Sequence, residues 1–115
     1  MQLFYATEQD LLTVDLPSRL DRETSSELER VLMDWRSRTG RGTLIDFCHV
    51  IYIDSSGLEV LWHHGKAVRE INGQVVLATV RESVFQVFEI NGLADTFTFA
   101  ATREEGMSLL RPDQA

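Results

Sequence analysis

The chain has 115 residues, of which 43% are apolar, and this composition is typical of one globular domain rather than of a disordered chain. The formal net charge of −7 and the pI of about 4.8 argue against nucleic acid as the main ligand, because phosphate binding needs clustered lysine and arginine. We expect a single domain over residues 1–115, with a core between about residues 3 and 110.

The single cysteine, Cys48, cannot form an internal disulfide, and its apolar neighbours predict a buried thiol. The first four residues lack the charged region and long apolar run of a signal peptide. No stretch of about 18 apolar residues is present, so we expect no membrane span. A cytoplasmic location is the resulting expectation.

Two strands are predicted first, over residues 2–7 and 11–16, with a short turn between them. Apolar residues then recur at helical spacing between positions 28 and 35, which predicts a helix that begins near Thr24. Residues 43–48 read as a buried strand.

The second half continues the alternation of helices and strands. The predicted elements are a helix with apolar positions 58, 61, 62 and 68, a strand over 74–80, a helix around 84–88, a strand over 96–101 and a short helix over 102–110. Such an order predicts an α/β domain, with a mixed, mostly parallel sheet of about five strands packed with about four helices.

The most informative motif is Asp54-Ser55-Ser56-Gly57, which follows the apolar residues 50–53 and precedes a predicted helix. Binding sites in parallel sheets gather beyond the carboxyl ends of the strands, so this loop should face the working edge. A phosphate on a hydroxyl in the first helical turn would meet exposed backbone N–H groups and the positive end of the helix dipole.

A purely structural interpretation of this motif stays open. Asp54 or a serine could simply cap the helix by accepting its unpaired N–H groups. Ser56 and Glu59 also have the spacing of a capping box.

The chain as a whole resembles the STAS domain, the family of bacterial anti-sigma-factor antagonists. The stretches that carry the resemblance are residues 16–21, residues 44–47 with 50–58, and residues 71–77 with 84–93. Pro17 departs from the family pattern, which usually has glycine there, and Glu59 stands where a small residue is common.

The resemblance implies that Ser55 is a phosphorylation site. It also implies that Asp21, Asp54, Ser55, Ser56 and Gly57 contact a protein partner. The unphosphorylated antagonist would bind an anti-sigma-factor serine kinase, be phosphorylated by it and let go, and a metal-dependent serine phosphatase would reset it. We expect no catalysis, cofactor or metal in the chain itself, and a monomer or weak dimer.

Two other functions remain open. One is a STAS scaffold subunit of a lipid-transport or stress-sensing complex, which is never phosphorylated. The other is a nucleotide-binding or hydrolytic enzyme, which the lack of a phosphate-binding glycine loop disfavours. The adjacent His63 and His64 point about 100° apart on a helix, so they cannot share a metal ion, and we expect them to be solvent-facing or half-buried.

Overall fold

The computed structural model describes residues 3–38 and 40–111. Strands and helices alternate along these residues. The strands are β1 (Phe4–Glu8), β2 (Leu11–Asp15), β3 (Arg19–Leu20), β4 (Gly42–Asp46), β5 (Tyr52–Ile53), β6 (Gln74–Ala78) and β7 (Thr98–Ala100). The helices are α1 (Arg22–Ser37), α2 (Ser55–Glu70), α3 (Glu82–Ile90) and α4 (Arg103–Leu110).

The main sheet has five strands in the order β1-β2-β4-β6-β7. β1 pairs antiparallel with β2, and the other pairs are parallel, so the predicted mixed, mostly parallel sheet is confirmed. The register places Asp15 of β2 opposite Asp46 of β4, and Asp46 opposite Ala78 of β6. The carboxyl ends of the central strands therefore meet at one edge of the sheet.

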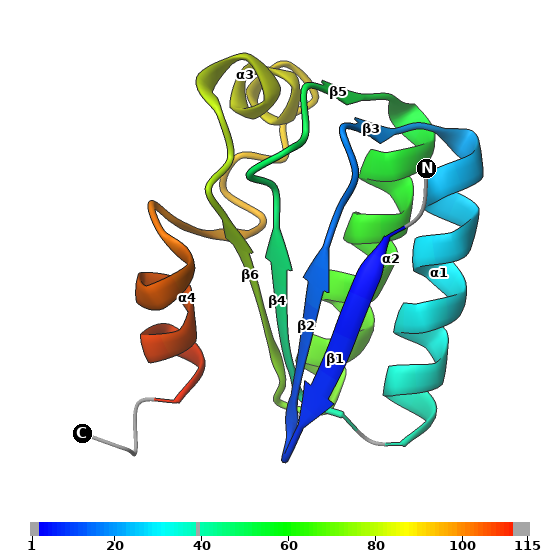
Figure 1. Ribbon diagram of the computed structural model, residues 1–115, viewed down its shortest axis with the longest axis vertical. Helices are drawn as coiled ribbons and strands as arrows, with labels where there is room; N and C mark the ends of the chain where they lie inside the picture. The colour runs from blue at the N-terminus through cyan, green and yellow to red at the C-terminus, as the bar shows by residue number, and fades with distance from the viewer. Residues whose placement is uncertain (1–2, 39, 112–115) are drawn as a thin grey trace.

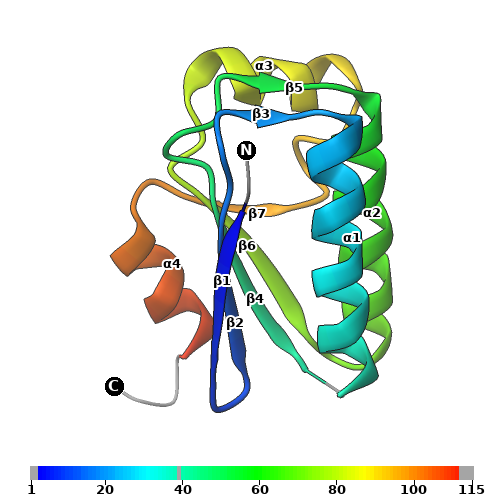
Figure 2. The same cartoon turned by 45° about the vertical axis from the view of Figure 1, so that its right-hand side comes forward.

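The sheet lies between two helical layers. α1 and α2 cover one face, and α4 covers part of the other (Figures 1 and 2). The larger apolar cluster fills the space under α1 and α2, and a smaller one, around Leu44, Val76, Ala78 and Ala100, lies under α4. Both faces of β4 and β6 are thus buried, which explains their nearly continuous apolar sequences.

Two short strands and a helix close the carboxyl-terminal edge of the sheet. β3 and β5 pair in parallel as a separate two-stranded sheet, and α3 runs beside them (Figure 2). The predictions did not include β3 or β5, because two residues are too few to show an alternating pattern. These two strands lead directly into α1 and α2.

Most predicted boundaries differ from the observed ones by a few residues, for local reasons. The strand predicted over 43–48 ends at Asp46, because the Asp46 carboxylate accepts the backbone N–H of Cys48 at 2.9 Å and turns the chain. The helix predicted to begin near Thr24 begins at Arg22, because Asp21 caps it. Residue 2, where the first strand was predicted to begin, lies outside the described residues.

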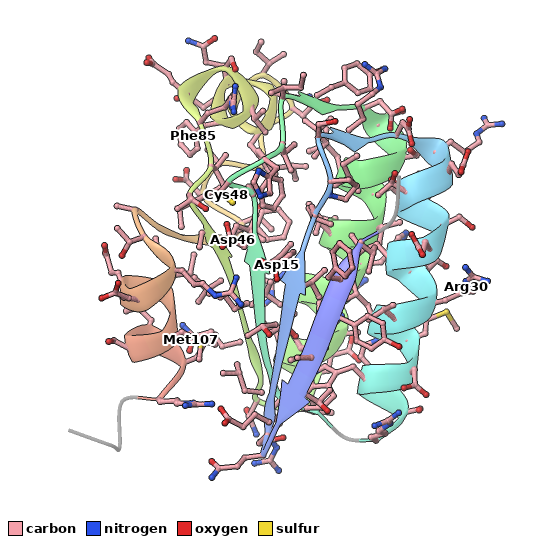
Figure 3. All side chains as sticks on the ribbon, in the orientation of Figure 1. Asp15, Arg30, Asp46, Cys48, Phe85 and Met107 are labelled. Carbon is pink, nitrogen blue, oxygen red and sulfur yellow. The ribbon has the colours of Figure 1, made fainter. Side chains whose placement is uncertain are left out.

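Two predictions about burial are wrong. Cys48 is exposed, because the chain leaves the sheet just before it (Figure 3). His64 is fully buried rather than solvent-facing or half-buried, because its neighbour His63 takes the outer position on α2. Over the described residues, no helix combines the length and the apolar character that a membrane crossing requires.

Candidate functional site

The candidate site lies where β5 passes into α2. Asp54 is the N-cap residue of α2, and its carboxylate accepts the backbone N–H groups of Ser56 at 3.0 Å and Gly57 at 3.3 Å. The same oxygen accepts the hydroxyl of Ser56. Asp54 therefore satisfies the first free N–H groups of the helix, as one of the predicted capping arrangements requires.

The capping box predicted for Ser56 and Glu59 is wrong. α2 already begins at Ser55, so Ser56 lies inside the helix and its hydroxyl bonds to the Asp54 carboxylate. The Glu59 carboxylate instead lies 3.8 Å from Nε2 of His63, one turn further along the exposed face of α2.

Ser55 is the first residue of α2, and it is exposed. Within residues 3–38 and 40–111, no hydrogen bond to its hydroxyl is found, whereas the hydroxyl of Ser56 is held by two partners. The two serines of the motif are thus chemically distinct. Only the Ser55 hydroxyl is both accessible and uncommitted, at the positive end of a helix dipole.

Asp21 caps the neighbouring helix in the same way. Its Oδ1 atom accepts the backbone N–H of Thr24 at 3.2 Å, at the start of α1. That hydrogen bond is the main reason why the pKa of Asp21 lies below its ordinary value. Asp21 is therefore an anion over the whole physiological pH range. It holds this capping position even though Pro17 replaces the glycine that the family usually has upstream of it.

The starts of α1 and α2 are joined to each other. The backbone N–H of Asp54 donates to the carbonyl of Leu20 at 3.3 Å, beyond the end of the β3–β5 pair. One turn into the helices, the hydroxyl oxygens of Ser56 and Ser25 lie 3.3 Å apart, and Ser56 accepts there because its own proton goes to Asp54. The structure therefore brings the two capping carboxylates, Asp21 and Asp54, to one shared rim beside Ser55.

Gly57 permits this close approach. A Cβ atom at this position would lie 2.8 Å from Cγ of Leu20 and 3.1 Å from Cγ1 of Ile53. A side chain would therefore push α2 away from the β3–β5 pair. The glycine of the motif has a packing role, which the sequence alone did not distinguish from a role in partner contact.

Three side chains beside the motif were not singled out from the sequence. Arg19 stacks its guanidinium on the ring of Tyr52, with 4.1 Å from the guanidinium carbon to the ring centroid. Tyr52 is 39% exposed and Ile51 is 56% exposed, although both belong to an apolar run that suggested burial. The sequence held no signal for their contact, because it depends on the parallel register of Arg19 with Tyr52, which only the fold shows.

Three hollows in the described part of the chain are not lined by Ser55. Hollows of about 200, 450 and 80 Å³ lie elsewhere, at the opposite edge of the sheet, between α1 and α2, and beside β7. Among the described residues, no group of three or more histidine, cysteine, aspartate or glutamate side chains could hold a metal ion. The exposed side chains beside Ser55 are apolar and charged, a combination suited to a protein partner.

A second polar cluster lies on the α4 side of the sheet and has a different role. Arg103 of α4 donates to Asp15 at 2.6 Å and to Asp46 at 3.0 Å, so it joins α4 to the ends of β2 and β4. Figure 3 labels the two aspartates on these strands. Burial raises the pKa of Asp46, but hydrogen bonds from Thr79, from the Cys48 N–H and from Arg103 outweigh that effect and lower it overall. This cluster fastens α4 to the sheet and lies away from Ser55.

Comparison with known proteins places the chain in one family. The family model for the STAS domain matches residues 5–106, so the chain belongs to the STAS domain family. The anti-sigma-B factor antagonist of Staphylococcus epidermidis is 30% identical over 89 residues, which cover 77% of this chain and 82% of that protein.

Solved structures show the same architecture. The unphosphorylated form of the anti-sigma factor antagonist SpoIIAA matches with a TM-score of 0.84 over 96% of both chains, at 18% identity. The phosphorylated form of SpoIIAA from Bacillus matches with a TM-score of 0.77 over 95% of this chain and 99% of that chain, at 17% identity. At this identity, these two matches establish the shared fold, and they confirm the predicted STAS architecture.

Proposed function

We propose that this chain is a phospho-regulated anti-sigma-factor antagonist. In this proposal it binds a serine-kinase anti-sigma factor while Ser55 is unphosphorylated, and it releases that partner when Ser55 carries phosphate. The observation that carries the proposal is the exposed Ser55 hydroxyl, which has no hydrogen-bond partner among the described residues and lies at the start of α2. The relatives named as anti-sigma antagonists, and a fold match in phosphorylated form, support it.

The proposed transfer needs only an accessible nucleophile from this chain. The Ser55 oxygen would attack the γ-phosphorus of ATP held by the partner kinase, ADP would leave, and the hydroxyl proton would pass to a base of the partner. The chain itself then acts as substrate and binding module, without catalysis of its own. The reset would come from a metal-dependent serine phosphatase, and the whole cycle would run in the cytoplasm, where ATP is available.

Release follows from electrostatics. Phosphate adds about −1.5 to −2 charge at neutral pH. The nearby Asp21 and Asp54 are carboxylates, and Glu59 lies one turn along α2, so a buried phosphate at the interface would be repelled and poorly solvated. In the free domain the same group remains hydrated at the helix start, so the fold tolerates it.

The transfer is tested by incubation with the native kinase and ATP, followed by intact mass. We expect a gain of about 80 Da that Ser55→Ala abolishes. Ser56→Ala is the matched control, because that hydroxyl is engaged with Asp54 and Ser25, and it should keep most of the gain. Transfer to Ser56, or no transfer with an active kinase, would favour the unphosphorylated scaffold instead.

The release step is tested by binding. We expect Ser55→Asp to fold normally. It should bind the partner kinase at least tenfold more weakly than the unphosphorylated wild type does, a difference of at least about 1.4 kcal/mol. If the aspartate variant binds the kinase as tightly as wild type does, the switch is wrong.

A further inference from the structure

Arg19 is a cation with unused hydrogen-bond donors at the proposed phosphorylation site. Its side chain is 57% exposed, and its guanidinium carbon lies over the ring of Tyr52, 4.1 Å from the centroid. Nε lies 3.8 Å from Oδ2 of Asp21, which is an ion-pair distance and too long for a hydrogen bond. No hydrogen bond to the guanidinium is found within the described ranges, so its N–H fork remains available to an anion.

The position of Arg19 places this fork at the rim shared by the two helix starts. Arg19 lies opposite Tyr52 in the β3–β5 pair, and its side chain reaches forward to Asp21, the cap of α1. The Asp54 N–H bonds to the carbonyl of Leu20, between Arg19 and Asp21 in the next strand, and Ser55 follows Asp54 directly. Arg19 and Ser55 therefore belong to adjoining segments at the rim where the two helices begin.

A phosphate on Ser55 would change the balance of charges in this area. It would add a dianion beside the carboxylates of Asp21 and Asp54, with Glu59 one turn further on. Guanidinium binds phosphate through two parallel N–H···O bonds, which are stronger than its present long contact with one carboxylate oxygen.

Asp21 can lose Arg19 without losing its capping role. The carboxylate uses Oδ1 to accept the N–H of Thr24 and Oδ2 to face Arg19. If the guanidinium of Arg19 moved to another anion, the cap at the start of α1 would therefore stay intact. The exchange needs only a side-chain rotation at an exposed position.

We infer that Arg19 is the residue that receives the phosphate of phosphorylated Ser55, giving up its contacts with Asp21 and with the face of Tyr52. Phosphorylation then does more than add charge. The guanidinium of Arg19 neutralises part of the new dianion within the chain. Its departure uncovers the ring of Tyr52, next to the exposed Ile51. The inference rests on the function proposed above, and it assigns Arg19 a positioning role in the phosphorylated state.

The test uses full-length protein in which phosphoserine is installed at position 55 by genetic encoding, so it needs no kinase. The second pKa of the phosphate is read by ³¹P NMR titration. Arg19→Gln should raise that pKa by about half a unit or more relative to wild type, because a cation that contacts the dianion favours it. Arg19→Lys should give an intermediate value, since lysine keeps the charge but loses the fork.

Two controls separate Arg19 from general charge effects. The side chain of Arg30, on α1, points away from the rim (Figure 3). Arg30→Gln removes the same charge as Arg19→Gln and should leave the phosphate pKa unchanged. Arg22, the exposed first residue of α1, is the competing cation. The inference is overturned if Arg19→Gln leaves the pKa at the wild-type value, or if Arg22→Gln produces the larger shift.

The test also distinguishes its own failure from that of the proposed function. Absence of a kinase-dependent mass gain would refute phosphorylation of Ser55 and leave the titration result untouched. An unchanged titration would refute the role of Arg19 and leave kinase transfer untouched. A second readout is the ring signals of Tyr52, which should move on phosphorylation in wild type and stay in place in Arg19→Gln.

Discussion

The guanidinium of Arg36 donates to Nδ1 of His64 at 2.8 Å, so the ring proton of this buried histidine must lie on Nε2. Nε2 lies 2.9 Å from the hydroxyl oxygen of Thr43 and donates to it. One neutral imidazole therefore connects α1, α2 and β4. Burial, together with the charge of Arg36, lowers the pKa of His64 from 6.5 to about 3.

This network predicts that the protein loses stability in mild acid. Below about pH 6.5 the unfolded chain takes up a proton on His64 while the native protein does not. The free energy of unfolding should therefore fall by up to about 1.4 kcal/mol per pH unit as pH decreases toward 4. Urea unfolding at a series of pH values measures this slope.

His64→Gln should flatten that slope, because an amide can accept from Arg36 and donate to Thr43 but does not titrate. His63→Gln is the matched control, since its ring is exposed, and it should keep the wild-type slope. A wild-type slope in His64→Gln would mean that other groups cause the acid sensitivity.

Two glycines of α2 should respond to alanine in opposite ways. Gly57→Ala places a methyl group 2.8 Å from Leu20, and overpacking of this kind costs about 1–3 kcal/mol. Gly65→Ala places it 3.4 Å from the Phe97 ring, an ordinary contact, and the gain in helix propensity should stabilise by up to about 1 kcal/mol. Thermal unfolding of both variants compares them directly, and equal effects would contradict the packing role of Gly57.

The carboxylates that hold Arg103 should contribute unequally. The Asp46 side chain is 7% exposed and also binds Thr79 and the Cys48 N–H, so Asp46→Ala should cost about 2–4 kcal/mol. The Asp15 side chain is 42% exposed, so Asp15→Ala should cost less than about 1 kcal/mol. Hydrogen exchange should show faster opening of α4 in Asp46→Ala, and equal protection in both variants would refute this assignment.

Asp54 should be separable into a capping role and a charge role. Asp54→Ala removes the cap of α2 and should lower stability by about 1 kcal/mol. Asp54→Ser keeps a capping oxygen without the charge, so it should fold almost as stably as wild type. If Asp54 also contacts the partner, as the family resemblance implies, Asp54→Ser should still bind the kinase more weakly. Unchanged binding would restrict Asp54 to capping.

The layered fold could be predicted because apolar periodicity identifies elements that are long enough to show it. The two-residue strands β3 and β5 were missed, since a pattern needs more residues than they contain. The same omission hid Arg19 and Tyr52, whose contact depends on the register of that pair.

The burial of side chains whose environment depends on distant segments could not be predicted from the sequence either. The burial of His64 depends on Arg36 and Thr43, which lie 28 and 21 residues away along the chain. The exposure of Cys48 depends on the turn that Asp46 makes. The motif around Ser55 was found because its cap, serine and glycine are contiguous, although its role as a phosphorylation site stays a prediction.

The common rim of α1 and α2 has a consequence for how a modification would be read. Both helices direct the positive ends of their dipoles toward one spot, so the field that an added dianion needs exists before the dianion arrives. The backbone has no cause to rearrange. The backbones of the two states should superpose closely in a crystal, yet the two states should migrate apart on isoelectric focusing, so a partner would sense surface potential and the local rearrangement of side chains, and not a change of fold.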